Sequence, residues 1–236
     1  MESLRIPRRF CGPPDSANGG YLAGSLAERL GERGPVEVTL LAPCPVEADL
    51  ILTREEAVLV ASGPEGPVAR ARAGGLDLEA CAPPDPACVA KVAGQSRAMQ
   101  THPFPGCFVC GPDREDGLGV YAGPVGSLAA ACWTPAPEWA DREGGVRREL
   151  LWAALDCPSI FPLLEDPDRA ARLEPMVLGR MTASIDGALA AGEPAVVAAW
   201  TLSAEGRKAL AAAALFDAGG GVVARALCTW ISIAGR

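Results

Sequence analysis

The chain has 236 residues, of which 49% are apolar and 21% are charged, and its formal net charge at pH 7 is −8. A chain of this length and composition is typical of a soluble globular protein with a sizeable core, folded as one large domain or two small ones. Nucleic acid is excluded as a partner because the charge is negative and no basic face is apparent. A membrane is not expected either, because no apolar run approaches the roughly 20 residues that span a bilayer.

The N-terminus and the cysteines indicate a reducing compartment. MESLRIPRRF lacks the apolar core of a signal peptide, so we expect a cytoplasmic protein. Nine cysteines are an odd number, and several stand in apolar patterns, which is typical of reduced, buried thiols. His102 is the single histidine, which excludes multi-histidine metal sites. Because it lies in a proline-rich stretch, we expect it at the surface or packed in a linker.

The first third of the chain predicts a strand, a helix and four antiparallel strands. A strand-like segment over 5–12 precedes a helix that begins near Asn18, a capping residue, and ends at Gly31. Inside it, leucines recur at every fourth position. Turn residues then separate four expected strands: 36–42, 45–53, 57–62 and 68–73.

The remainder of the chain predicts a connector and a second copy of the same element order. Prolines without periodicity indicate a connector over 81–117, with a short helix at 87–93, between domains at 1–80 and 118–236. The second domain is expected to contain strands and one apolar helix: strands 118–122 and 128–133, helix 149–164, a loop at 165–174, then strands 177–186, 194–203, 208–217 and 222–233. An antiparallel sheet wrapped around an apolar helix, formed twice, defines an α+β fold.

Asp156 is the charge in the middle of the most apolar segment, ELLWAALDCPSIFPLL. A helix that is apolar on all sides is normally buried, and a buried carboxylate needs partners, a proton or a wet pocket. Pro158 in the same helix removes one backbone hydrogen bond and favours a kink. Asp156 is therefore a candidate catalytic residue, and a structural bridging role is the alternative.

A second candidate site lies where a loop enters the first helix. Asn18, Gly19, Gly20 and Tyr21 place free backbone N–H groups and the positive end of the helix dipole at one spot. Such a spot suits a carbonyl oxygen that becomes an oxyanion during acyl transfer. The alternative is that the glycines only permit a tight turn.

The motif CFVC adds two neighbouring thiols, Cys107 and Cys110. With Cys81 and Cys88 they offer four zinc ligands, but the spacing of the upstream pair is wider than in a zinc knuckle. A redox role has no supporting strand and helix around the motif. We therefore expect a tight turn with partly buried thiols, and neither a metal nor a cofactor.

Several segments resemble the double-hotdog acyl-CoA thioesterases. SANGGYLAGSLAERL and the following VEVTLLAPCPVEADLIL resemble that family's first half, in which a Gly-Gly pair opens the central helix. LWAALDCPSIF resembles its second helix, MTASIDGALAAGEP its next strand, and GVVARALCTWISI its last strand. CFVCGPDREDGLGV resembles hotdog proteins of thioesterase type. The resemblance covers most of the chain and implies two tandem hotdog domains, an acyl-CoA or related acyl thioester substrate, and a homodimer.

The resemblance also implies roles for single residues. Asp156 matches the family's catalytic aspartate, which holds or activates the hydrolytic water, and Ser184 matches a hydroxyl residue that positions this water. The chain departs from the family at two places. Gly187 stands where a histidine is expected, and the polar amide of the last strand falls near Cys228 or Thr229, of which Thr229 is the candidate contributor.

Three functions follow from these residues. The first is hydrolysis of an acyl thioester, with Asp156 as base and the Asn18–Tyr21 amides as oxyanion donors. The second is a non-catalytic protein of the same fold that binds acyl chains or acyl thioesters, which the two departures favour. A hydratase is disfavoured, since its usual histidine has no candidate outside the connector.

Overall fold

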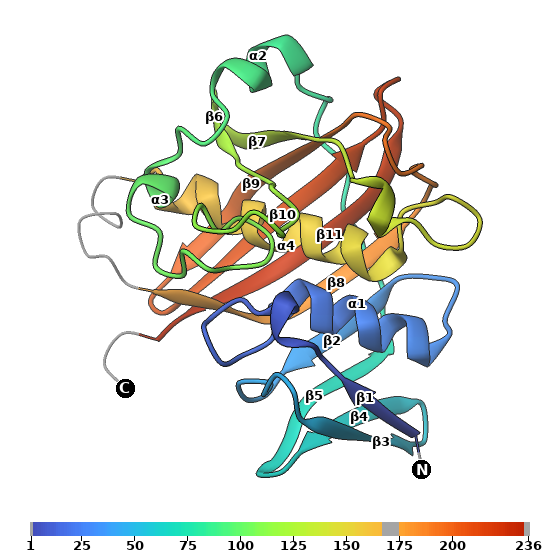
Figure 1. The fold of residues 1–236 in the computed structure, drawn as a ribbon. Helices are drawn as coiled ribbons and strands as arrows, with labels where there is room; N and C mark the ends of the chain where they lie inside the picture. Colours follow the sequence, from blue (N-terminus) through green and yellow to red (C-terminus); the bar gives the residue numbers. More distant parts are fainter. Residues whose placement is uncertain (1, 167–174, 234–236) are drawn as a thin grey trace.

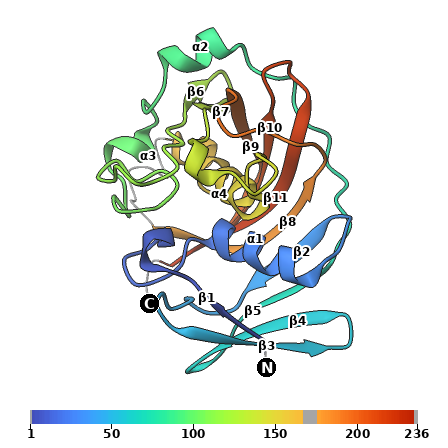
Figure 2. The same ribbon diagram turned by 45° about the vertical axis from the view of Figure 1, so that its right-hand side comes forward.

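In the computed structural model, which describes residues 2–166 and 175–233, eleven strands form one antiparallel sheet. The sheet curves around two long helices, α1 (Gly19–Leu30) and α4 (Arg148–Leu164), which lie side by side (Figure 1). Seen from the second direction, both helices remain on the inner side of the sheet (Figure 2). The core thus fills the space between one bent sheet and a pair of helices.

The two halves of the sheet have the same topology. The first half contains β1 (Glu2–Arg5), β2 (Val36–Leu40), β3 (Asp49–Glu55), β4 (Val58–Gly63) and β5 (Gly66–Ala73). The second contains β6 (Gly123–Val125), β7 (Leu128–Trp133), β8 (Met176–Ile185), β9 (Ala195–Glu205), β10 (Lys208–Phe216) and β11 (Val222–Ser232). The spatial order β1-β3-β4-β5-β2 is repeated by β7-β9-β10-β11-β8, and β6 adds one edge strand. The predicted repeat of element order is confirmed.

The two halves are joined along one strand pair. β2 and β8 pair antiparallel, with Val36 opposite Ala183 and Thr39 opposite Arg180. The sheet is therefore continuous from one half to the other. Two short helices, α2 (Pro86–Lys91) and α3 (Arg97–Gln100), lie in the connecting segment. The boundaries 1–80, 81–117 and 118–236 stay a prediction, because a continuous sheet has no break that marks a boundary.

Helix α1 begins and ends as its sequence predicts. The Asn18 side chain accepts a hydrogen bond from the Tyr21 N–H, and Gly31 ends the helix in the left-handed conformation, with φ of 79°. Leu22, Leu26 and Leu30 are buried on the core side. The predicted strands that follow are confirmed with shifts of a few residues at their ends, the largest at β3, which starts at Asp49 because Glu47 has a positive φ.

Helix α4 continues through two prolines, Pro158 and Pro162, and is buried along nearly all its length. Burial on every side accounts for the apolar sequence around Asp156. Within residues 2–166 and 175–233, neither α4 nor any other helix is long and apolar enough to cross a membrane. The expected loop at 165–174 lies outside the described residues after Asp166.

Two predicted strands were wrong. The segment 118–122 belongs to no strand, because the Leu118 and Val120 amides bond to the carbonyls of Phe108 and Val109 in the loop of the CFVC motif. The short strand β6 follows it instead. The segment 5–12 contains a 3-10 turn at Arg8–Phe10, and the strand β1 lies before it.

The two central helices approach each other closely at glycines. A Cβ atom on Gly20 would lie 2.5 Å from the Cβ of Asp156, and one on Gly24 would lie 2.6 Å from the Cα of Glu149. Because these positions are four residues apart, they form one small-residue face of α1. This face lets the backbone of α1 pack directly on α4.

Replacement of Gly24 by Ala tests this contact. We expect the variant to lower the free energy of unfolding by about 1–3 kcal/mol, because the methyl group forces α1 and α4 apart. The same change favours an isolated helix by up to about 1 kcal/mol, so a net loss identifies the crowding. Urea denaturation gives the value. Gly34→Ala is the control, because a Cβ there meets nothing within 4 Å, and equal stability of the two variants would contradict the close contact.

Candidate active site

The Asp156 carboxyl group points from α4 to the start of α1. Its Oδ2 accepts a hydrogen bond of 2.9 Å from the Gly20 N–H and another of 2.9 Å from the Asn18 Nδ2. Both donors come from the first half of the chain, and the acceptor comes from the second half. The site is therefore built across the contact between the two central helices.

The second carboxyl oxygen of Asp156 has no such partner. Oδ1 is buried and makes no hydrogen bond within residues 2–166 and 175–233. Burial raises the pKa of Asp156 to about 7, the Gly20 N–H and the Asn18 side chain act against this rise, and the nearby Cys107 adds to it. One oxygen is thus held by two donors, while the other is a buried acceptor with no partner in the described part of the chain.

The first three amides of α1 have different uses. The Gly20 N–H bonds to Asp156, and the Tyr21 N–H bonds to the side chain of Asn18. The Gly19 N–H has no acceptor in the described part of the chain. Of the amides expected at an oxyanion site, Gly19 is therefore the one that remains available, at the positive end of the helix dipole. The two glycines have different roles, because Gly20 lets α4 pack against the α1 backbone and Gly19 lines a cavity.

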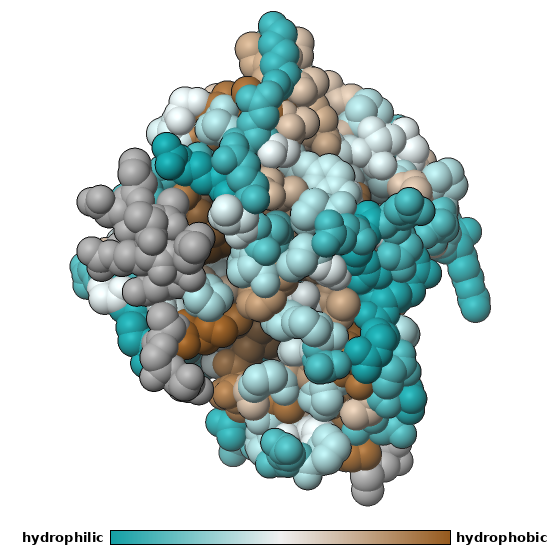
Figure 3. Space-filling view, turned by 60° about the vertical axis from the view of Figure 1, so that its left-hand side comes forward, coloured by the Kyte–Doolittle hydropathy of each residue, from teal (hydrophilic) through white to brown (hydrophobic). Residues whose placement is uncertain are grey.

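A cavity of about 380 Å³ leads to this position. Asn18, Gly19, Asp156 and Cys157 form its polar end. The other walls are largely aliphatic and aromatic side chains from several elements, including Leu22, Leu40, Phe104, Leu178, Trp230 and Ile231. The space-filling view presents a hollow with apolar side chains at its floor (Figure 3). An apolar pocket with a few polar groups at one end suits a ligand with a hydrocarbon part and a polar head.

Two candidates from the sequence lie elsewhere. The Ser184 hydroxyl donates a 2.6 Å hydrogen bond to Asp186, which in turn accepts from Arg225. Thr229 lies between Cys228 and Trp230, which are both buried toward α4, so its side chain points to the opposite face of the sheet. Neither residue lines the cavity. The structure does not bring Ser184 or Thr229 to Asp156.

The last strand contacts the Asp156 helix through a different pair. The Trp230 Nε1 donates a 2.7 Å hydrogen bond to the Ser159 hydroxyl, and this hydroxyl donates a 2.7 Å bond to the backbone carbonyl of Asp156. Both side chains are buried. These bonds fix the turn of α4 that carries Asp156. The signal in the sequence is a serine three residues after the aspartate, at a spacing that lets its hydroxyl reach the Asp156 carbonyl within one helical turn.

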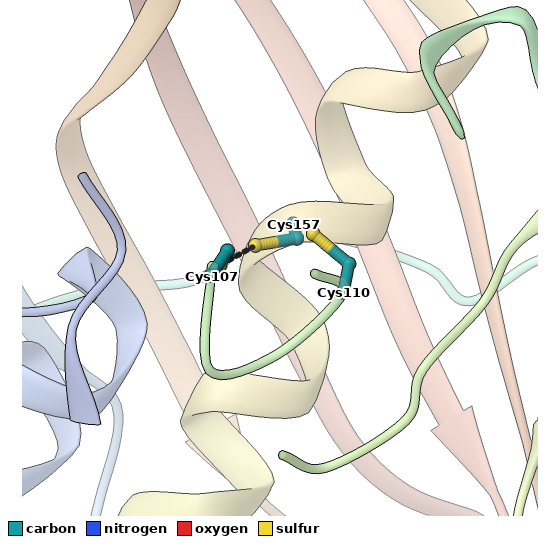
Figure 4. A group of neighbouring side chains, drawn as sticks. All are labelled: Cys107, Cys110 and Cys157. Atoms are coloured by element: carbon teal, nitrogen blue, oxygen red, sulfur yellow. Dashed lines mark hydrogen bonds between the residues drawn. The ribbon is translucent and has the colours of Figure 1, made fainter. Parts of the chain in front are cut away.

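The CFVC loop lies directly on this site. Cys107 and Cys110 meet Cys157 of α4, and the three side chains point toward one another (Figure 4). Hydrogen bonds from the Cys110 and Cys157 thiols lower the pKa of Cys107. His102, expected at the surface or in a linker, is partly buried with its Nε2 3.1 Å from the Cys110 Sγ.

The four-cysteine combination considered from the sequence is not formed. Cys88 is exposed and its thiol bonds to Asp85, and neither Cys81 nor Cys88 joins the group around Cys107. In their place stands Cys157, which the sequence puts directly after Asp156. Because 46 residues separate Cys157 from the CFVC motif, local sequence patterns could not predict this contact.

Comparisons with known proteins place this architecture among solved structures. A TesB protein of Mycobacterium avium subsp. paratuberculosis matches over 98% of this chain and 91% of its own, with a TM-score of 0.63 and 12% identity. An acyl-CoA thioesterase II, TesB2, of Mycobacterium marinum matches over 98% and 91%, with a TM-score of 0.61 and 14% identity. A conserved protein of unknown function with a hot dog fold from Alicyclobacillus acidocaldarius matches over 99% and 93%, with a TM-score of 0.63 and 12% identity.

At these identities the likeness shows the fold. The chain is a tandem hotdog protein of the α+β class, and the predicted fold class is confirmed. No protein-family model and no curated protein matches the sequence.

Variants of Asn18 test how the site is held together. Asn18→Ala removes both the helix cap and the donor to Asp156, and we expect it to lower the free energy of unfolding by about 1–3 kcal/mol. Asn18→Ser keeps a cap for the Tyr21 N–H and loses only the donor, so its loss should be smaller. Chemical denaturation of both variants measures the difference. Equal losses would mean that the cap contributes nothing to stability.

Proposed function

We propose that this protein hydrolyses an acyl thioester of the acyl-CoA class. The observation that carries the proposal is the Asp156 carboxyl group, which is held through Oδ2 by Gly20 and Asn18, has no hydrogen-bond partner at the buried Oδ1 in the described part of the chain, and belongs to a residue that lines a largely apolar cavity. Solved structures whose names include the word thioesterase share the fold, which supports this reaction class.

The reaction proceeds by direct attack of water. Asp156 Oδ1 accepts a proton as the water oxygen attacks the thioester carbonyl carbon. The carbonyl oxygen becomes an oxyanion beside the Gly19 N–H, where a backbone donor and the helix dipole stabilise it. The carbon–sulfur bond then breaks, and the thiolate leaves and takes up the proton. The proposal assigns no role to Ser184 or Thr229, because neither side chain lies at the cavity.

Replacement of Asp156 by Asn is the direct test. We expect kcat for release of free CoA to fall by about 10²–10⁴, because the amide cannot accept the proton. Release is followed by chromatography, since a thiol reagent would also report the nine cysteines. Asp186→Asn is the matched control, because that carboxylate bonds to Arg225 and Ser184 and does not line the cavity.

The control should keep the wild-type rate. Turnover that survives unchanged in Asp156→Asn would remove Asp156 from the mechanism. No turnover by the wild type across short, medium, long and aromatic acyl groups would favour the alternative, a non-catalytic protein that binds acyl thioesters. The displacement of Ser184 and Thr229 from the site is the observation that keeps this alternative open.

The apolar walls predict a dependence on acyl-chain length. Each methylene group that enters the cavity is buried, which contributes about 0.8 kcal/mol, or roughly a fourfold gain in kcat/KM. The gain should continue until the cavity is full and then stop. A series of straight-chain acyl-CoA substrates measures it. A flat series would show that the acyl chain does not enter this cavity.

The homodimer implied by the family resemblance and the cytoplasmic location expected from the sequence stay predictions. Both edges of the sheet are short strands, β1 with four residues and β6 with three. Short edge strands offer little backbone for pairing with a second sheet, so a dimer would use another surface. Light scattering of the purified protein measures its mass in solution.

A further inference from the structure

Three cysteine sulfurs from two distant parts of the chain converge beside the candidate active site. Cys107 and Cys110 come from the loop, and Cys157 comes from α4 (Figure 4). All three Sγ atoms lie within 4.8 Å of one another, and those of Cys107 and Cys157 are 3.6 Å apart. Each side chain is buried. Three buried thiols that converge in this way suggest a shared ligand.

The spacing of the sulfurs matches ligands around one metal ion. Zn–S bonds of about 2.3 Å in tetrahedral geometry place two sulfurs about 3.8 Å apart. A disulfide requires about 2.05 Å and uses only two sulfurs, so it would leave the third thiol buried beside it. The observed 3.6 Å separation agrees with the first arrangement.

The loop is shaped to present its two sulfurs to one point. The Gly111 N–H donates to the Cys107 carbonyl at 2.9 Å and closes the turn between the two cysteines. A Cβ on Gly111 would lie 2.5 Å from the Cys107 backbone nitrogen, so this tight turn requires glycine. The segment 118–120 holds the outer side of the loop by two further backbone bonds.

Side-chain N–H groups surround the cluster as well. Asn18 Nδ2 lies 3.7 Å from the Cys157 Sγ and 4.0 Å from the Cys107 Sγ. His102 Nε2 lies 3.1 Å from the Cys110 Sγ, and the Phe104 N–H donates to His102 Nδ1. Because Nδ1 accepts, Nε2 carries the proton of the neutral ring and donates it toward the Cys110 sulfur. Every sulfur therefore has an N–H neighbour, which is the surrounding that thiolate ligands require.

We propose that Cys107, Cys110 and Cys157 bind one Zn²⁺ ion, with Asn18 and His102 as hydrogen-bond donors to the ligand sulfurs. Thiolates are soft ligands, and zinc is among the metals that such ligands bind selectively. On binding, three S–Zn bonds form to thiolate sulfurs, and each sulfur that still carries a proton releases it to the solvent. The three thiolates and the ion carry a net charge of −1, which the surrounding N–H groups stabilise. The ion would tie the CFVC loop to α4, next to Asp156.

The metal content of the purified protein tests the proposal. Protein produced with added zinc should contain about one equivalent of zinc per chain, since such sites bind tightly. Cys110→Ser and Cys157→Ser should each lose most of it. Cys44→Ser and Cys228→Ser are matched controls, because both cysteines are buried and lie outside the cluster, and they should keep the wild-type content.

Cobalt titration of the metal-free wild type keeps the test independent of whether the variants fold. Thiolate-to-cobalt charge-transfer bands and the release of up to about three protons per ion are expected. Zinc below about a tenth of an equivalent together with absent bands would overturn the proposal. A disulfide between two of the three cysteines in the unreduced protein, detected by mass spectrometry, would also overturn it. Because neither readout uses hydrolysis, failure here is separate from failure of the proposed function.

Discussion

The close contact between α1 and α4 is the constraint on which the candidate site depends. Gly20 and Gly24 have no side chains to separate the helices, so the backbone of one helix packs on the other. This proximity lets the Gly20 N–H reach the Asp156 carboxyl group. A larger residue at Gly20 would both separate the helices and remove this bond. Gly20 therefore determines both how closely the two helices pack and whether Asp156 receives its backbone hydrogen bond.

The same contact explains how a carboxyl group is tolerated in the core. Burial alone would strongly disfavour the charged form, but the helix start supplies one backbone donor and the Asn18 amide supplies another. Asn18 also caps the helix through its oxygen, so one side chain uses both ends of its amide. Trp230 and Ser159 fix the other side of the Asp156 turn. Asp156 is thus held at one oxygen of its carboxyl group and at its backbone carbonyl.

Local patterns were sufficient to predict most of the fold. The cap at Asn18, the stop at Gly31 and the alternation in the strands depend on near neighbours in sequence, and they were found. The segment 118–122 was misjudged because its amides bond to a loop instead of a strand. Asp156 stood out by its charge, whereas the partnership of Cys157 with the CFVC loop depends on tertiary contact. Ser184 was assigned by resemblance, and the side of the sheet that it faces could not be read from that likeness.

The repeated topology gives the molecule an approximate internal twofold axis that its side chains break. Counted from the start of each helix, the ninth residue is Asp156 in α4 but Ala27 in α1, and the second is Gly20 in α1 but Glu149 in α4. At the location related by this axis to the Asp156 site, an alanine therefore replaces the acid and a glutamate replaces the glycine. A symmetric pair of such halves would carry two equivalent centres, while this chain retains one. The fold thus offers two matched places for an acid beside a glycine at a helix start, and the sequence fills only one of them.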